Sequence, residues 1–113
     1  MNTTLAITIP PNVIRNAGEP VFPVLRNYVR GSSRLLSLIN AREVYGIAKY
    51  GQTLMSDDGR DTPTEVVNEA LDLLANLTKL TMQYPADSGL VILLRDTVAL
   101  VEEIVAAMAE VQS

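Results

Sequence analysis

Hydrophobic and polar positions follow a helical period over most of the chain after residue 24. Between residues 24 and 50 apolar side chains recur every three or four residues, which predicts a helix with one buried face. Gly31-Ser32-Ser33 interrupts this pattern, and a serine there can cap a second helical segment. Two further helical stretches, 62–83 and 90–111, are separated by a turn. The pattern therefore predicts an all-α protein, a small helical bundle of three main helices.

Residues 1–20 do not follow a helical pattern. Leu5 to Ile9 has the composition of a short strand, which Pro10-Pro11 ends. One short strand has no partner within the chain, so we expect residues 1–20 to form an extended N-terminal arm, either packed on a neighbouring subunit or loose. Residues 21–113 are expected to form the helical bundle domain. Residues 51–62 within it read as a loop, with Ser56-Asp57-Asp58-Gly59 as a turn signal.

The helix predicted over residues 62–83 has a narrow polar side. Thr62 is placed to cap it, and Glu65 occupies the position from which a capping-box glutamate reaches back. Apolar residues cover roughly 200° of its circumference, more than the stripe of about 100° on an ordinary surface helix. The polar side chains of the remaining face are Glu65, Glu69, Asp72, Asn76, Lys79 and Gln83. This face is either solvated or directed into a polar interior between helices.

The composition excludes several classes of chemistry. The chain has 113 residues, which suggests one domain, and it contains no Cys and no His. Disulfides, thiolate zinc sites and nucleophilic catalysis of the Ser-His or Cys-His kind are therefore excluded. Any metal would be a hard ion held by oxygen, Mg²⁺ or Mn²⁺. No apolar run reaches the roughly 18 residues that span a membrane, and no signal peptide is recognisable, so we expect a cytoplasmic protein without a membrane partner.

The net charge of −4 is unevenly distributed. Residues 1–60 hold seven basic and four acidic residues, whereas residues 61–113 hold two basic and nine acidic residues. A negatively charged chain argues against nonspecific binding to nucleic acid. Arg26, Arg30 and Arg34 recur at four-residue spacing and should share one face of the first predicted helix. That face is either a solvated basic stripe or an anion-binding surface.

Polar oxygen ligands recur in pairs, three residues apart, on two of the predicted helices. Asn40-Ala-Arg-Glu43 has the pattern N-x-x-E, and 25 residues later Glu69-Ala-Leu-Asp72 has the pattern E-x-x-D. This arrangement resembles the signature of MazG-like proteins, the all-α nucleoside triphosphate pyrophosphatases, in which E-x-x-E and E-x-x-D flank a spacer of about that length. Asn40 stands where the family pattern has its first Glu, so one negative charge is missing.

Two shorter motifs extend the resemblance. Lys49-Tyr50-Gly51 and Gly59-Arg60-Asp61 are similar to stretches of short MazG-like proteins encoded by bacteriophages. The resemblance covers roughly residues 36–80 and implies helices that pair across a dimer. The broad apolar faces of the helices favour the same conclusion, because a three-helix monomer would leave much of them exposed. We therefore expect a homo-oligomer, a dimer or larger.

The resemblance implies a Mg²⁺-dependent (or Mn²⁺-dependent) nucleotide site. The metal ligands it implies are Asn40, Glu43, Glu69 and Asp72, of which Glu43, Glu69 and Asp72 would be catalytic. Glu65, one helical turn before Glu69, is added to the metal ligands because it could supply the charge that is missing at Asn40. The nucleotide-binding residues it implies are Lys49, Tyr50, Arg60, Lys79 and Arg34, with Tyr45 as a second ring able to stack on a base. The metal would neutralise phosphate charge and lower the pKa of an attacking water.

Three functions remain open. The first is a metal-dependent pyrophosphohydrolase that cleaves a nucleotide between its α and β phosphates. The second is a nucleotide-binding protein without turnover, such as a phage protein that sequesters a linear or cyclic nucleotide signal of host defence in the host cytoplasm. The uncharged Asn40 and the basic residues between 26 and 60 favour this second function. The third is a structural or partner-binding bundle whose polar residues make only contacts between helices.

Overall fold

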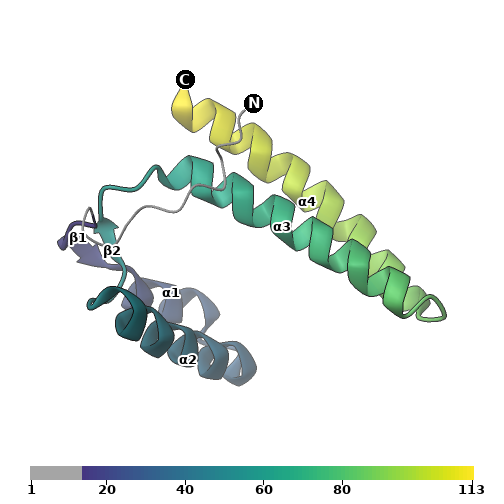
Figure 1. Cartoon of the computed structure of the whole chain (residues 1–113), viewed down its shortest axis with the longest axis horizontal. Helices are drawn as coiled ribbons and strands as arrows, with labels where there is room; N and C mark the ends of the chain where they lie inside the picture. The colour runs from purple at the N-terminus through teal and green to yellow at the C-terminus, as the bar shows by residue number, and fades with distance from the viewer. Residues whose placement is uncertain (1–13) are drawn as a thin grey trace. The chain divides into compact units, whose positions relative to one another are not determined.

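The computed structural model of the chain describes residues 14–113, which form two compact units, residues 14–60 and residues 61–113. Helices make up most of both units (Figure 1), so the all-α prediction holds in outline. Four helices and a small two-stranded sheet lie in this part of the chain, where the pattern predicts three main helices. The strand predicted at Leu5 to Ile9 lies outside the described residues. Across residues 14–113, no helix has the length and apolarity that crossing a membrane requires.

In residues 14–60, two strands accompany a pair of helices. The element order is β1 (Ala17–Pro20), α1 (Val21–Val29), α2 (Ser33–Tyr50) and β2 (Met55–Asp57). The predicted helical stretch splits at Gly31-Ser32-Ser33, as its composition indicates. Ser32 Oγ accepts a hydrogen bond from Leu35 N, which caps α2, and α1 packs against α2.

The basic stripe predicted from Arg26, Arg30 and Arg34 does not form. α1 ends at Val29, Arg30 is its C-cap residue, and Arg34 lies in the first turn of α2. Because the chain turns between the two helices, Arg26 donates its hydrogen bonds to side chains of α2. Arg30 and Arg34 are exposed, so the three arginines occupy different surroundings.

β1 and β2 form an antiparallel pair. The facing residues are Ala17 with Asp57 and Pro20 with Met55. Gly18 has a φ of 85° and lies so close to β2 that an added Cβ would come within 2.2 Å of Ser56 Oγ. The same hydroxyl accepts a hydrogen bond from Glu19 N at 2.8 Å. Residues 17–20 are therefore part of a sheet rather than of a separate arm, and the stretch predicted as a loop at 51–62 contains a strand.

Residues 61–113 form a helical hairpin. α3 (Thr62–Gln83) and α4 (Ser88–Gln112) pack along each other and are joined by a short turn (Figure 1). The predicted cap at Thr62 is wrong by one residue, because Asp61 accepts hydrogen bonds from the backbone N–H and the hydroxyl of Thr64. α4 begins two residues before the predicted start, because Asp87 accepts a hydrogen bond from Leu90 N.

The covered side of the hairpin follows a seven-residue repeat. Less exposed side chains recur at alternating spacings of three and four residues, namely Val67, Ala70, Leu74, Leu77 and Thr81 on α3, and Leu90, Leu94, Thr97, Val101, Ile104 and Met108 on α4. This is the seam spacing of a coiled coil. Leu71 and Leu73, beside the seam, remain 45% and 48% exposed. The hairpin alone therefore covers only part of the broad apolar arc predicted for α3.

Candidate functional site

Two cationic side chains lie on one tyrosine ring at the end of α2. Arg60 Cζ is 4.6 Å from the centroid of the Tyr50 ring, and Lys49 Nζ is 5.2 Å from it. Gly51 ends α2 in the left-handed region, at a φ of 77°, and donates its N–H to the Ile47 carbonyl. The chain then forms β2 and returns Arg60 to the ring. The structure thus brings together Lys49, Tyr50 and Arg60, three of the nucleotide-binding residues that the resemblance implies.

A buried carboxylate positions Arg60. Asp58 is 5% exposed and is the one buried polar residue among residues 14–113. Its Oδ1 accepts a hydrogen bond from Arg60 N at 3.1 Å, and its Oδ2 lies 3.8 Å from Arg60 Nε. A buried carboxylate is costly without a nearby cation or hydrogen-bond donor, so the two residues hold each other in place. The sequence pattern predicted only a turn at Asp58. The one signal in the sequence for its contact with Arg60 is that the two residues are two positions apart.

The charges around Tyr50 also act on its hydroxyl group. Hydrogen bonding from Arg60 lowers the pKa of Tyr50, burial opposes this effect, and Lys49 lowers the pKa further. A phenol in such surroundings is a better hydrogen-bond donor than one in water. The cluster of Lys49, Tyr50 and Arg60 therefore combines positive charge with an aromatic face. Phosphate groups require the first feature, and stacked bases use the second.

Asn40 and Glu43, the first pair of predicted metal ligands, are engaged by Arg26. Arg26 Nε donates to Asn40 Oδ1 at 2.8 Å, and Arg26 Nη2 donates to Glu43 Oε1. Thr53 Oγ1 donates to Glu43 Oε2 at 2.7 Å. The bond from Thr53 lowers the pKa of Glu43 most, burial opposes it, and Arg26 lowers the pKa further. Both carboxylate oxygens of Glu43 thus have donors, which link α1, α2 and the segment before β2.

This arrangement of Asn40 and Glu43 does not fit a Mg²⁺ ion. The guanidinium of Arg26 already lies against both groups, and a second cation in the same place would be repelled by it. Within residues 14–60, and likewise within residues 61–113, no group of three or more acidic side chains lies together as a set of metal ligands. Metal binding at this half-motif would require Arg26 to leave.

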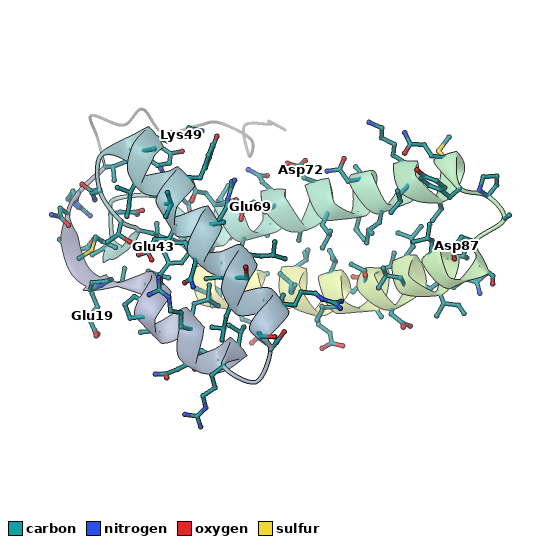
Figure 2. The ribbon with its side chains drawn as sticks, turned by 90° about the horizontal axis from the view of Figure 1, so that it is seen from below. Glu19, Glu43, Lys49, Glu69, Asp72 and Asp87 are labelled. Carbon is teal, nitrogen blue, oxygen red and sulfur yellow. The ribbon has the colours of Figure 1, made fainter. Side chains whose placement is uncertain are left out.

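The remaining acidic residues of the predicted site lie on α3. Glu69 and Asp72 are exposed and one helical turn apart, as Figure 2 shows, and Glu65 is partly covered in the first turn. Lys79 lies farther along the same helix and is exposed. The convergence of these side chains with Glu43 stays a prediction from the resemblance.

Two other predicted binding residues on α2 lie apart from the cluster at Tyr50. Arg34 precedes Lys49 by fifteen residues on α2, a separation of about 22 Å along the helix axis. Tyr45 is 52% exposed and has Arg42 Cζ at 4.7 Å from its ring centroid. Arg34 therefore does not join the cluster, and Tyr45 forms a separate exposed pair with Arg42.

Comparison of the chain with protein-family models, with curated proteins and with solved structures found no match.

Proposed function

We propose that this protein binds a nucleotide through Lys49, Tyr50 and Arg60. The observation that supports the proposal is the placement of two cations on one aromatic ring at the end of α2. A guanidinium binds phosphate oxygens through paired N–H donors, an ammonium adds a compact charge, and a phenol ring stacks on a base. A nucleotide would contact the guanidinium and the ammonium through its phosphates and the phenol ring through its base, whereas an inorganic anion would not contact the ring.

We further infer that the nucleotide is held without being hydrolysed. Catalysis of the MazG-like kind needs divalent metal near Glu43, and Arg26 supplies positive charge there instead. The missing carboxylate at Asn40 is consistent with this difference. Sequestration of a linear or cyclic nucleotide, in the manner of a phage protein that counters host defence, is therefore the leading candidate.

A Mg²⁺-dependent pyrophosphohydrolase is the second candidate. The observation that favours it is the exposure of Glu69 and Asp72 on one face of α3. Neither residue takes part in the ion pairs found within residues 14–113. Both carboxylates are thus available to a metal brought by a nucleotide.

The first experiment identifies the ligand. The purified full chain is incubated with a mixed panel of linear and cyclic nucleotides and Mg²⁺, and unbound material is removed by filtration. Mass spectrometry of the denatured protein and of the filtrate then distinguishes the candidates. An intact nucleotide released from the protein supports sequestration. A monophosphate with pyrophosphate in the filtrate supports hydrolysis, and the absence of both refutes nucleotide binding.

The second experiment tests the residues, with the nucleotide retained in the first. Lys49→Gln should weaken binding roughly tenfold, because it removes one charge-assisted hydrogen bond of about 1.5 kcal/mol. Arg34→Gln removes the same charge from the far end of α2 and should leave the affinity unchanged. Tyr50→Leu should weaken binding, whereas Tyr50→Phe keeps the ring and should retain most of it. Equal losses in Lys49→Gln and Arg34→Gln would place the ligand elsewhere.

A further inference from the structure

A row of valines runs along α4 beside the seam of the hairpin. Val91, Val98 and Val105 recur every seven residues and are 37%, 45% and 38% exposed. Seven residues make nearly two turns, so the three side chains lie in one line along the helix. At 100° per residue this line is displaced by about 80° from the centre of the covered seam. The valines are therefore not the contacts that hold the hairpin together.

The valine row of α4 and exposed apolar side chains of α3 lie on the same face of the hairpin. In an antiparallel pair of helices, the side of α3 that adjoins the valine row carries Leu71 and Met82, which are 45% and 75% exposed. A coiled-coil helix whose apolar positions extend beyond the seam is suited to packing against more than one neighbour. A helix with the same seven-residue period would pack on this face, and a second copy of α4 has that period.

The charges beside the valine row select how a second copy would pack. Arg95 and Glu102 are also seven residues apart, and both are exposed on the outer side of the row. When two identical helices pair antiparallel, residues equally far before and after the axis lie opposite each other. With Val98 on the axis, Val91 faces Val105 of the second copy. Arg95, three residues before the axis, then lies beside Glu102 of the second copy, which is four residues after the axis and therefore displaced by only about 1.5 Å along the helix.

Neither Arg95 nor Glu102 forms an ion pair within residues 14–113. The antiparallel arrangement would form the Arg95–Glu102 ion pair twice, once on either side of the axis. A parallel two-fold arrangement would instead place the Arg95–Glu102 flanks of the two copies on opposite sides of the interface, so neither residue would gain an ion pair. The charges therefore favour the antiparallel, two-fold arrangement.

The other exposed apolar row of α4 lacks this complementarity. Leu93 and Leu100 are 49% and 54% exposed on the opposite flank of the seam. Asp96 and Glu103 lie beside them and are both acidic. A second copy placed there would bring like charges together at every position, so this row does not suit pairing of α4 with itself.

We propose that two copies of this chain pair through the valine row of α4, antiparallel, about a two-fold axis at Val98. The two hairpins then form a four-helix bundle in which both valine rows are covered. The proposal depends only on α3 and α4, and it is independent of nucleotide binding.

Charge exchange tests the pairing in the full chain. Sedimentation at low salt should show a dimer for the native protein. Arg95→Glu and Glu102→Arg should each raise the dimer dissociation constant at least tenfold, because each places like charges together on both sides of the axis. The double variant restores opposite charges and should restore the dimer. A monomeric native chain, or a double variant no better than the single ones, would overturn the proposal.

A control variant separates the two faces of α4. Glu103→Arg changes the charge by the same amount as Glu102→Arg but lies on the leucine side, so its dissociation constant should equal that of the native protein or be lower. A loss of dimer in Glu103→Arg with no loss in Glu102→Arg would refute the choice of face. Circular dichroism of each variant confirms that the helices are intact.

Crosslinking tests the axis, because the native chain contains no Cys. Val98→Cys places two thiols together at the axis, and mild oxidation should yield a disulfide-linked dimer. Val91→Cys lies on the same row, but its two copies would be about 21 Å apart in the antiparallel arrangement, so it should stay monomeric on a denaturing gel. A mixture of Val91→Cys and Val105→Cys should crosslink. Crosslinking of Val91→Cys alone would indicate parallel pairing and would overturn the proposed axis.

Discussion

Replacing Arg26 by Met should destabilise residues 14–60 far more than the same replacement at Arg30. Arg26 donates hydrogen bonds to Asn40 and Glu43 on the facing helix. Its side chain is 34% exposed, and that of Glu43 is 18% exposed. Arg30 is exposed at the end of α1 and takes part in none of the ion pairs found in residues 14–113. The two substitutions therefore remove the same charge and the same side-chain length from different surroundings.

The size of the effect follows from the partial burial of the Arg26–Glu43 pair. A hydrogen bond to a charged group contributes roughly 1.5–3 kcal/mol when buried, and a fully exposed ion pair contributes under about 1 kcal/mol. Because Thr53 still donates to Glu43 after the change, we expect Arg26→Met to cost about 2 kcal/mol. Glu43→Gln should cost about 1 kcal/mol. The double variant should cost about 1 kcal/mol less than the sum of both, since the two side chains interact directly.

Urea unfolding followed by tyrosine fluorescence measures this effect. The chain has no Trp and four Tyr, of which Tyr28, Tyr45 and Tyr50 lie in residues 14–60. A Tyr84→Phe background removes the remaining tyrosine, so the signal then reports only on that unit. The prediction would be refuted if the unfolding free energies of Arg26→Met and Arg30→Met were within about 0.5 kcal/mol of each other. The bonds from Arg26 to α2 would then contribute nothing measurable.

Three further predictions concern backbone geometry and protonation. Gly18→Ala should lower the unfolding free energy by about 2 kcal/mol or more, because alanine disfavours a positive φ and its Cβ would clash with Ser56; urea unfolding measures this. An absorbance titration should show the phenol of Tyr50 ionising below its ordinary pKa of 10.0, and Arg60→Gln should raise that pKa. The pKa of Glu43 lies below its ordinary value of 4.5, so its contribution to stability is complete above that value and is lost as the pH falls toward the folded pKa. Between neutral pH and about pH 3, the urea midpoint of Glu43→Gln should therefore fall less than that of the native protein.

The helices are the part of the fold that is most readily predicted from sequence. α3 and α4 carry long, regular apolar repeats with turn residues between them, and such local patterns survive in almost any tertiary setting. The sheet is different. β2 has three residues within a segment rich in turn formers. Its partner, β1, is separated from it in the sequence by both α1 and α2. Strand pairing over such a distance leaves no periodic signal in the sequence.

The candidate site was predictable only as a set of residue types. The grouping of Lys49, Tyr50 and Arg60 follows from the resemblance to short phage proteins, and no local spacing requires it. The role of Asp58 depends on burial, which the packing of β2 decides. Arg26 reaches Asn40 and Glu43 only because the chain turns between α1 and α2, so that the two helices pack against each other. A continuous helix would not bring these side chains together. Both roles are tertiary effects.

The pairing of β1 with β2 also makes residues 15–58 a topologically closed module. Arg15 N donates a hydrogen bond to the Asp58 carbonyl at 2.7 Å, so the first and last residues of this module lie next to each other. A short peptide linker could join those ends, and new termini could be opened at Gly31, where an added Cβ would meet nothing within 4 Å. Such a circular permutant changes the order of the elements along the chain but keeps every strand and helix and the pairing of β1 with β2. Because its two ends lie together, we expect the module to be accepted in a loop of another protein as a single insertion.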